Sequence, residues 1–221
     1  MTEFALALAA FLAAHSLPRA TGLRDLAIKQ VGRRTYVILY SVLSVGLLAW
    51  LISAALRAPY LELWAPGAAT THAALALMLP ACLLFAMAAA RRNPLSIAFA
   101  QGARPSAAPG VLALTRHPIL WAFALWSTAH LIANGDLVAA ILFGGMGIFS
   151  LAGMAIMDRR ARRTMGEAAW AEAVARLRRA ELSALFTRRC LVEAAIGALL
   201  YAALLHLHGP VIGVDPLALW R

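Results

Sequence analysis

The sequence predicts an all-α fold, a polytopic membrane helical bundle, from its composition and from the pattern of its apolar and basic residues. Of its 221 residues, 62% are apolar and only 14% are charged, and the mean hydropathy is +0.76. An ordinary soluble domain is about 45–50% apolar and about 25% charged, so a soluble core of this size cannot bury the excess. The composition therefore excludes a soluble enzyme, a disordered tail and a disulfide scaffold.

The apolar residues form six runs, each approaching the roughly 20 residues that an α-helix needs to cross a bilayer. The first run is the shortest. Glu3 stands where a signal peptide carries basic residues, so we expect a retained span. The sequence thus predicts about six transmembrane helices in a single integral membrane domain covering residues 1–221. The runs lie at 1–17, 35–56, 70–90, 115–133, 137–157 and 191–208.

The net charge of +10 is explained by where the basic residues lie. Of the 20 Lys and Arg residues, 18 lie in segments 18–34, 91–116 and 158–190, which alternate with segments poor in basic residues. The positive-inside rule places these three segments in the cytoplasm and both termini outside. The positive charge is therefore better explained by membrane orientation and by contact with anionic lipid headgroups than by binding to nucleic acid.

Two segments have a pattern that predicts packing. In segment 158–182, Trp170, Val174 and Leu177 recur at helical spacing among many Arg residues, which predicts a cytoplasmic amphipathic helix on the inner leaflet. In the fifth run, a small residue stands at every third position, and small faces let membrane helices approach closely. The small residues are Gly144, Gly147, Ser150 and Gly153.

Histidines near the membrane core are candidates for function, because ionisable groups there are costly. His15 and His117 come from different predicted spans at a similar depth on the inner side. Two neutral imidazoles on facing helices can ligate a six-coordinate haem iron. A capping or packing role for each remains an alternative. His130 and His206 are weaker polar candidates toward the outer side, where His130 with His206 or His208 would form a second pair.

Several short elements follow one another along nearly the whole chain. They include Ala14-His15-Ser16, Gly32-Arg33-Arg34-Thr35-Tyr36, Thr115-Arg116-His117-Pro118, Ala129-His130-Leu131, and Asp158-Arg159-Arg160. Together, in this order, they resemble the NnrU family of bacterial inner-membrane proteins, which is related to the plastid 15-cis-zeta-carotene isomerase. The resemblance implies an inner-membrane location, which with the charge pattern makes both termini periplasmic.

The resemblance also implies a cofactor and a role. NnrU proteins are associated with denitrification, in particular with nitrite and nitric oxide metabolism. The related isomerase binds haem b through two His and acts on a cis double bond in a redox-dependent way. Its Ala-His-Ser and Arg-His-Pro elements match His15 and His117, which implies that these residues ligate haem iron. Arg116 is then a partner for a haem propionate, with snorkelling to the headgroups as its alternative role.

Two other functions are compatible with the same residues. The Arg-His-Pro element also resembles isoprenylcysteine and phospholipid methyltransferases, but Asp158 and Arg159 replace their paired Glu. The chain is alternatively a non-enzymatic maturation factor for a denitrification enzyme. The expected partners are the lipid bilayer, a hydrophobic small molecule, and a denitrification or redox partner protein. Catalytic residues are not assigned, and if the protein is an enzyme, the resemblance implies an isomerase.

Overall fold

The computed structural model describes residues 1–100 and 109–218, and the regular elements in these ranges are helices. The predicted all-α fold is confirmed. Within the described chain, contacts group the residues into two compact units, Met1–Leu61 and Glu62–Arg221, and each unit is described by itself. This grouping by contacts does not test the prediction of a single domain over residues 1–221, which stays a prediction.

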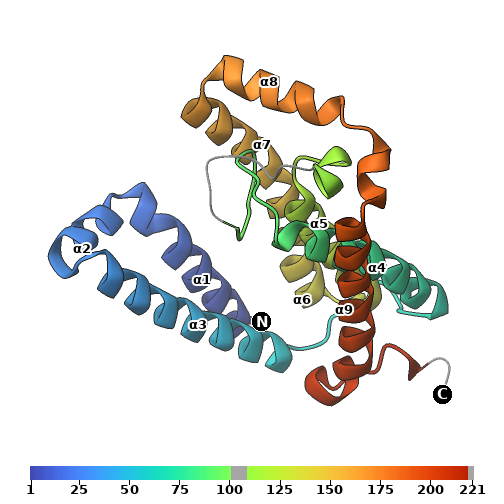
Figure 1. The fold of residues 1–221 in the computed structure, drawn as a ribbon. Coiled ribbons are helices and arrows are strands. Elements are labelled where there is room, and N and C mark those ends of the chain that lie inside the picture. The colour runs from blue at the N-terminus through green and yellow to red at the C-terminus, as the bar shows by residue number, and fades with distance from the viewer. Residues whose placement is uncertain (101–108, 219–221) are drawn as a thin grey trace. The chain divides into compact units, whose positions relative to one another are not determined.

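The first unit consists of α1 (Thr2–Ala20), α2 (Leu23–Val31) and α3 (Arg33–Arg57). Helices α1 and α3 lie side by side, and α2 connects them at one end (Figure 1). Segments Thr2–Pro18 and Leu23–Val31 meet at a bend of 73°. Much of the apolar surface of α3 is exposed, as is typical of a helix that faces lipid.

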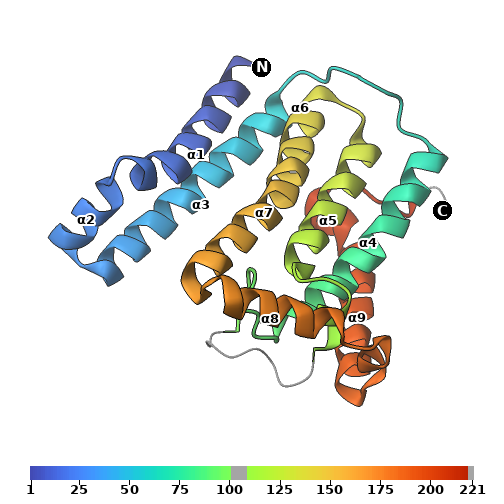
Figure 2. The ribbon, with the colours of Figure 1, turned by 90° about the horizontal axis from the view of Figure 1, so that it is seen from above.

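The second unit is a bundle of four long helical segments. Helix α5 (Pro118–Asn134) packs against both α4 (Ala68–Ala89) and α7 (Gly145–Met165), and α9 (Arg188–Ile212) packs against α4 (Figure 2). Before α7, the chain forms a short helix α6 (Leu137–Ala139) and a π-helical turn at Ala140–Gly144.

Small residues allow two close helix contacts in this bundle. A Cβ atom at Gly153 on α7 would lie 3.4 Å from Leu120 on α5, and Ser150 on the same face of α7 is buried. This confirms the predicted packing role of the small residues of the fifth run, apart from Gly144, whose surroundings are open. Sequence reasoning did not single out Gly197 on α9, where a Cβ atom would lie 2.8 Å from the Cα atom of Leu83 on α4.

Each of the six predicted runs is helical, and the helical membrane bundle is confirmed by length and composition. Four described segments are long and apolar enough to cross a bilayer, and the bent pair α1–α2 is a fifth if it counts as one span. Helix α5 has 17 residues, the lower limit for a span. The number of six crossings stays a prediction. The four segments are Arg33–Arg57, Ala68–Ala89, Leu137–Met165 and Arg188–Ile212.

The predicted amphipathic helix is present as α8 (Glu167–Arg178), which crosses one end of the second unit (Figure 2). Its apolar residues Trp170, Val174 and Leu177 pack against Leu95 and Ala161, not against open space. The guanidinium carbon of Arg162 also lies 3.8 Å from the centre of the Trp170 ring. The apolar face of α8 is thus largely covered by the chain itself. This differs from the expected contact of that face with the inner leaflet.

Candidate functional site

His117 lies directly before α5, where Pro118 occupies the first helical position with its fixed φ and without a backbone N–H. Two side chains hold this corner. Thr115 Oγ1 accepts the backbone N–H of His117 at 3.1 Å, and Asn93 Nδ2 donates to the carbonyl of Arg116 at 2.7 Å. The segment that follows α4 is therefore fixed to the start of α5, and it brings Ser96 beside the His117 ring.

The two ring nitrogens of His117 have different surroundings. Nδ1 is 2.8 Å from Ser96 Oγ, a hydrogen-bond distance. Nε2 is 3.3 Å from Asp158 Oδ1, but it is buried and makes no hydrogen bond within the part of the chain that the structure describes. Burial lowers the pKa of the His117 imidazole, an effect that the Asp158 carboxylate partly offsets. Burial thus favours the neutral form of the ring, which is the form that can ligate a metal.

Asp158 on α7 binds Arg116 in a fork geometry. The Oδ2 atom is 2.8 Å from Nη2 of Arg116, and Oδ1 is 3.4 Å from its Nε. Both side chains are partly exposed, at 30% for Arg116 and 20% for Asp158. The positive charge of Arg116 is thus balanced by the carboxylate of Asp158. The propionate and snorkelling roles considered for Arg116 stay predictions.

A cleft of about 570 Å³ opens beside His117, within the usual size range of ligand pockets. Its polar lining comprises Thr115, Arg116, His117, Asp158 and Arg178. Its other walls are mostly apolar and include Trp121 of α5, one helical turn after His117. The apolar lining further comprises Leu112, Ala113, Leu114, Leu151, Met154, Ala155 and Leu177. The cleft lining therefore combines apolar side chains with two guanidinium groups and one carboxylate, which suits an amphipathic molecule with negative charge.

His15 lies in the first unit, on α1. Its ring is exposed, and its Nδ1 is 2.7 Å from the backbone carbonyl oxygen of Phe11. The ring of Phe11 lies 4.3 Å from it and that of Tyr40 on α3 lies 5.8 Å away, measured between ring centres. Because His15 and His117 belong to different units, their pairing stays a prediction.

The outer histidines are placed as follows. The His130 ring on α5 contacts the rings of Trp126 and Phe143, and its centre is 6.3 Å from that of the His208 ring on α9. Its Nδ1 is 2.9 Å from the carbonyl oxygen of Trp126. His206 is exposed, with Nδ1 2.8 Å from the carbonyl oxygen of Ala202. Among the described residues, no three His, Cys, Asp or Glu side chains form a group that could hold a metal ion.

Sequence reasoning missed part of this site. It did not single out Ser96 or Asn93, which come from an irregular segment and contact residues 21 and 23 positions away. It also missed Arg178, which reaches the cleft because α8 folds back across the end of the bundle. Asp158 was noted only as part of a resemblance. The excess of Arg in segment 158–190 was the one signal that pointed toward Arg178.

Comparison with known proteins agrees with the fold and with the short elements described above. The family model described as "NnrU protein" matches residues 3–216, nearly the whole chain. No curated protein and no solved structure matches the chain. Because the family match extends over both units, the chain belongs to the NnrU family.

Proposed function

We propose that this NnrU-family protein binds haem b in the bacterial inner membrane, with its site in the cleft beside His117, and serves redox chemistry associated with nitrite and nitric oxide metabolism. The observation that carries the proposal is the state of the His117 ring. Its Nε2 is buried without a hydrogen bond in the described part of the chain, although a buried nitrogen usually has a partner; Asp158 Oδ1, 3.3 Å away, instead accepts from Arg116 Nε. A metal ion that accepts the Nε2 lone pair would supply the missing partner.

The contacts around His117 fit a metal-ligating histidine. Such a histidine usually donates its second ring N–H to a neighbouring group, which fixes the ring and its tautomer. Ser96 Oγ is placed to accept that hydrogen from Nδ1 at 2.8 Å. His15 has a comparable arrangement in the first unit. Its Nδ1 faces a carbonyl oxygen, which can only accept, so Nε2 carries the lone pair.

The lining of the cleft suits the apolar and charged parts of haem b. A haem has a flat apolar macrocycle and two propionate groups, and guanidinium groups bind carboxylates well. Arg178 and Arg116 both line the cleft, and Trp121 and Leu151 belong to its apolar lining. Arg116 is already engaged by Asp158, so Arg178 is the better candidate for a propionate.

Bound haem would supply one-electron redox chemistry or Lewis-acid chemistry. The residues of the chain have simpler tasks: Ser96 orients the imidazole, and Asp158 holds the Arg116 side chain in the cleft lining. Isomerisation of a polyene is the enzymatic form of this proposal, by analogy with the related plastid isomerase.

The test is the haem content of full-length protein purified in detergent after expression with added haem. Variants His117→Ala and His15→Ala are expected to lose the Soret band. Ser96→Ala is expected to weaken haem binding about 10–100-fold, the usual loss when a group that hydrogen-bonds a metal-ligating histidine is removed. His206→Ala is the matched control, because this exposed ring has its Nδ1 on a carbonyl of its own helix. A full Soret band in His117→Ala would refute the proposed ligand.

A further inference from the structure

A second groove, of about 560 Å³, lies between the end of α4 and the start of α9, away from the His117 cleft. It is lined by Ala90 from the α4 side and by Arg188, Arg189, Val192 and Glu193 of α9. Neither the proposed haem site nor the family match assigns a role to these residues. The charges and the apolar surface around the groove indicate what it binds.

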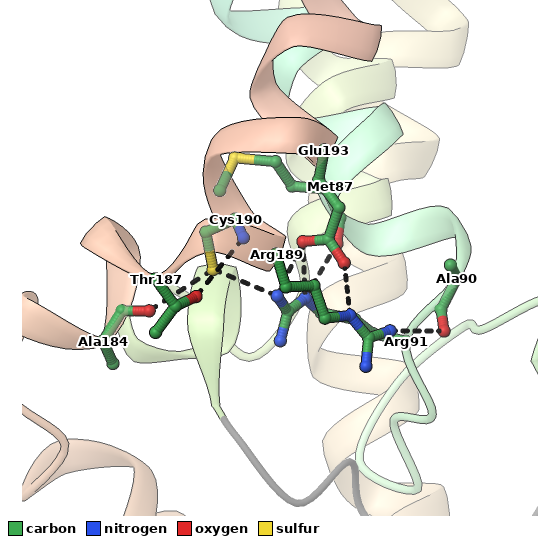
Figure 3. A network of polar contacts seen from close by, with 8 residues as sticks. All are labelled: Met87, Ala90, Arg91, Ala184, Thr187, Arg189, Cys190 and Glu193. Carbon is green, nitrogen blue, oxygen red and sulfur yellow. Dashed lines mark hydrogen bonds and ion pairs between the residues drawn. The ribbon is translucent and has the colours of Figure 1, made fainter.

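The polar side of the groove rests on a buried ion pair (Figure 3). The Glu193 Oε2 atom accepts from Arg91 Nη2 at 2.6 Å and from Arg91 Nε at 3.1 Å, and the Arg91 side chain is 1% exposed. The other carboxylate oxygen, Oε1, accepts from Arg189 Nε at 2.8 Å. Both oxygens of the acid are thus engaged by guanidinium groups, which offsets the cost of burying a charge.

The groove has a surplus of positive charge. The lining side chains Arg188, Arg189 and Glu193 carry one net positive charge, and the buried Arg91 that pairs with Glu193 adds a second. Arg189 also donates to the backbone carbonyl of Ala90 at 3.3 Å, which fixes its guanidinium group across the groove toward the α4 side. A basic pocket between membrane helices is a typical site for the phosphate of an anionic lipid.

An apolar strip begins at the groove and continues along α9. Val192 lines the groove, and Ile196 and Leu199 follow at spacings of four and three residues, so the three side chains share one face of the helix. Their exposed fractions are 53%, 54% and 70%. Because α9 is long and apolar enough to cross a bilayer, this strip lies at the depth of acyl chains when the arginines lie at the depth of headgroups.

We propose that the groove binds an anionic phospholipid, whose phosphate lies between Arg188 and Arg189 and whose acyl chains run along the strip Val192–Ile196–Leu199. The combination of a basic groove with an apolar strip favours an anionic phospholipid over an acidic soluble partner, a zwitterionic lipid or free phosphate. An acidic soluble partner would use the arginines without the strip. A zwitterionic lipid would use the strip without the surplus charge. Free phosphate would need neither the strip nor a membrane.

The test measures lipid binding to the full-length protein in detergent, by native mass spectrometry with titrated phosphatidylglycerol, phosphatidylcholine or inorganic phosphate. We expect phosphatidylglycerol to bind preferentially, and the Arg188→Gln/Arg189→Gln variant to lose about 30-fold in affinity. That figure follows from about 1 kcal/mol per basic residue near an anionic surface and 1.4 kcal/mol per tenfold change. The matched control is Arg159→Gln/Arg163→Gln, an equal change in charge at exposed positions of α7.

Three results would overturn the proposal. The first is equal binding of phosphatidylglycerol and phosphatidylcholine, and the second is equal loss of affinity in the groove variant and the control variant. The third is displacement of the bound lipid by inorganic phosphate at millimolar concentration, which would leave the apolar strip without a role. If the double variant does not fold, Arg188→Gln alone is compared in the same titration. Haem content is recorded separately, so failure of this proposal leaves the haem proposal unaffected.

Discussion

The substitution Gly110→Ala tests whether the buried Arg91–Glu193 pair holds the second unit together. Gly110 begins a short 3-10 helix (Gly110–Ala113) with φ of +51°, in the left-handed region that favours glycine. A Cβ atom at this position would lie 2.3 Å from the guanidinium carbon of Arg91. That guanidinium group cannot easily give way, because it donates to the Met87 carbonyl, to Glu193 and to the Cys190 sulfur.

The expected loss of stability has two parts. The left-handed backbone of a residue with a Cβ atom costs about 1–2 kcal/mol. Displacing Arg91 leaves the Glu193 carboxylate buried without its main partner, which costs about 3–5 kcal/mol. We therefore expect Gly110→Ala to lower the free energy of unfolding by about 4–7 kcal/mol. If Arg91 could move at no cost, only the backbone contribution would remain.

The assay is a denaturant titration of the detergent-solubilised protein, followed by circular dichroism of the helices. Gly213→Ala is the matched control, because Gly213 has a left-handed backbone, with φ of +88° and ψ of −1°, and a Cβ atom there would meet nothing within 4 Å. This control isolates the backbone cost, and we expect it to lose about 1–2 kcal/mol. If Gly110→Ala and Gly213→Ala unfold within about 1 kcal/mol of each other, the reasoning about the Arg91–Glu193 pair is refuted.

Two further predictions concern the helix contacts and the alternative function. Gly197→Leu places a side chain where a Cβ atom would already lie 2.8 Å from the Leu83 Cα, so it should lower the free energy of unfolding by at least the 1–3 kcal/mol of ordinary overpacking, measured in the same titration. The control Gly46→Leu should be nearly neutral, because nothing lies within 4 Å of its Cβ position. Equal losses in the two variants would contradict the close packing of α4 and α9. Calorimetry with S-adenosylmethionine should show no saturable binding, because Asp158 is paired with Arg116 and Arg159 stands in place of a second acid. Binding at micromolar concentration would instead support the methyltransferase interpretation.

The helices were predictable because an apolar run of span length has few alternatives in a membrane. Their ends were less predictable. Helix α5 begins at Pro118, three residues later than the predicted run, because side-chain hydrogen bonds hold the preceding corner. Helix α7 continues to Met165, beyond the predicted end at 157. The apolar run ends at the first charged residues, but charged residues do not end a helix. The helix ends before Gly166, which has φ of +84°.

Only part of the candidate site was predictable. His117 was singled out because a titratable residue at the edge of a span is costly, and the structure places it in the wall of a cleft. Ser96, Asp158 and Arg178 meet it only through tertiary packing, which local periodicity does not encode. The same holds for Arg91 and Glu193, which lie 102 residues apart and form the most buried ion pair described. Sequence reasoning gave no signal for that pair.

The central claim is that the neutral, hydrogen-bond-deficient imidazole of His117 ligates haem iron. The most direct measurement is the absorption spectrum of the purified wild-type protein, recorded before and after dithionite, together with the haem-to-protein ratio. The account predicts a Soret band that shifts on reduction and a ratio near one. A colourless protein after expression with added haem would contradict it.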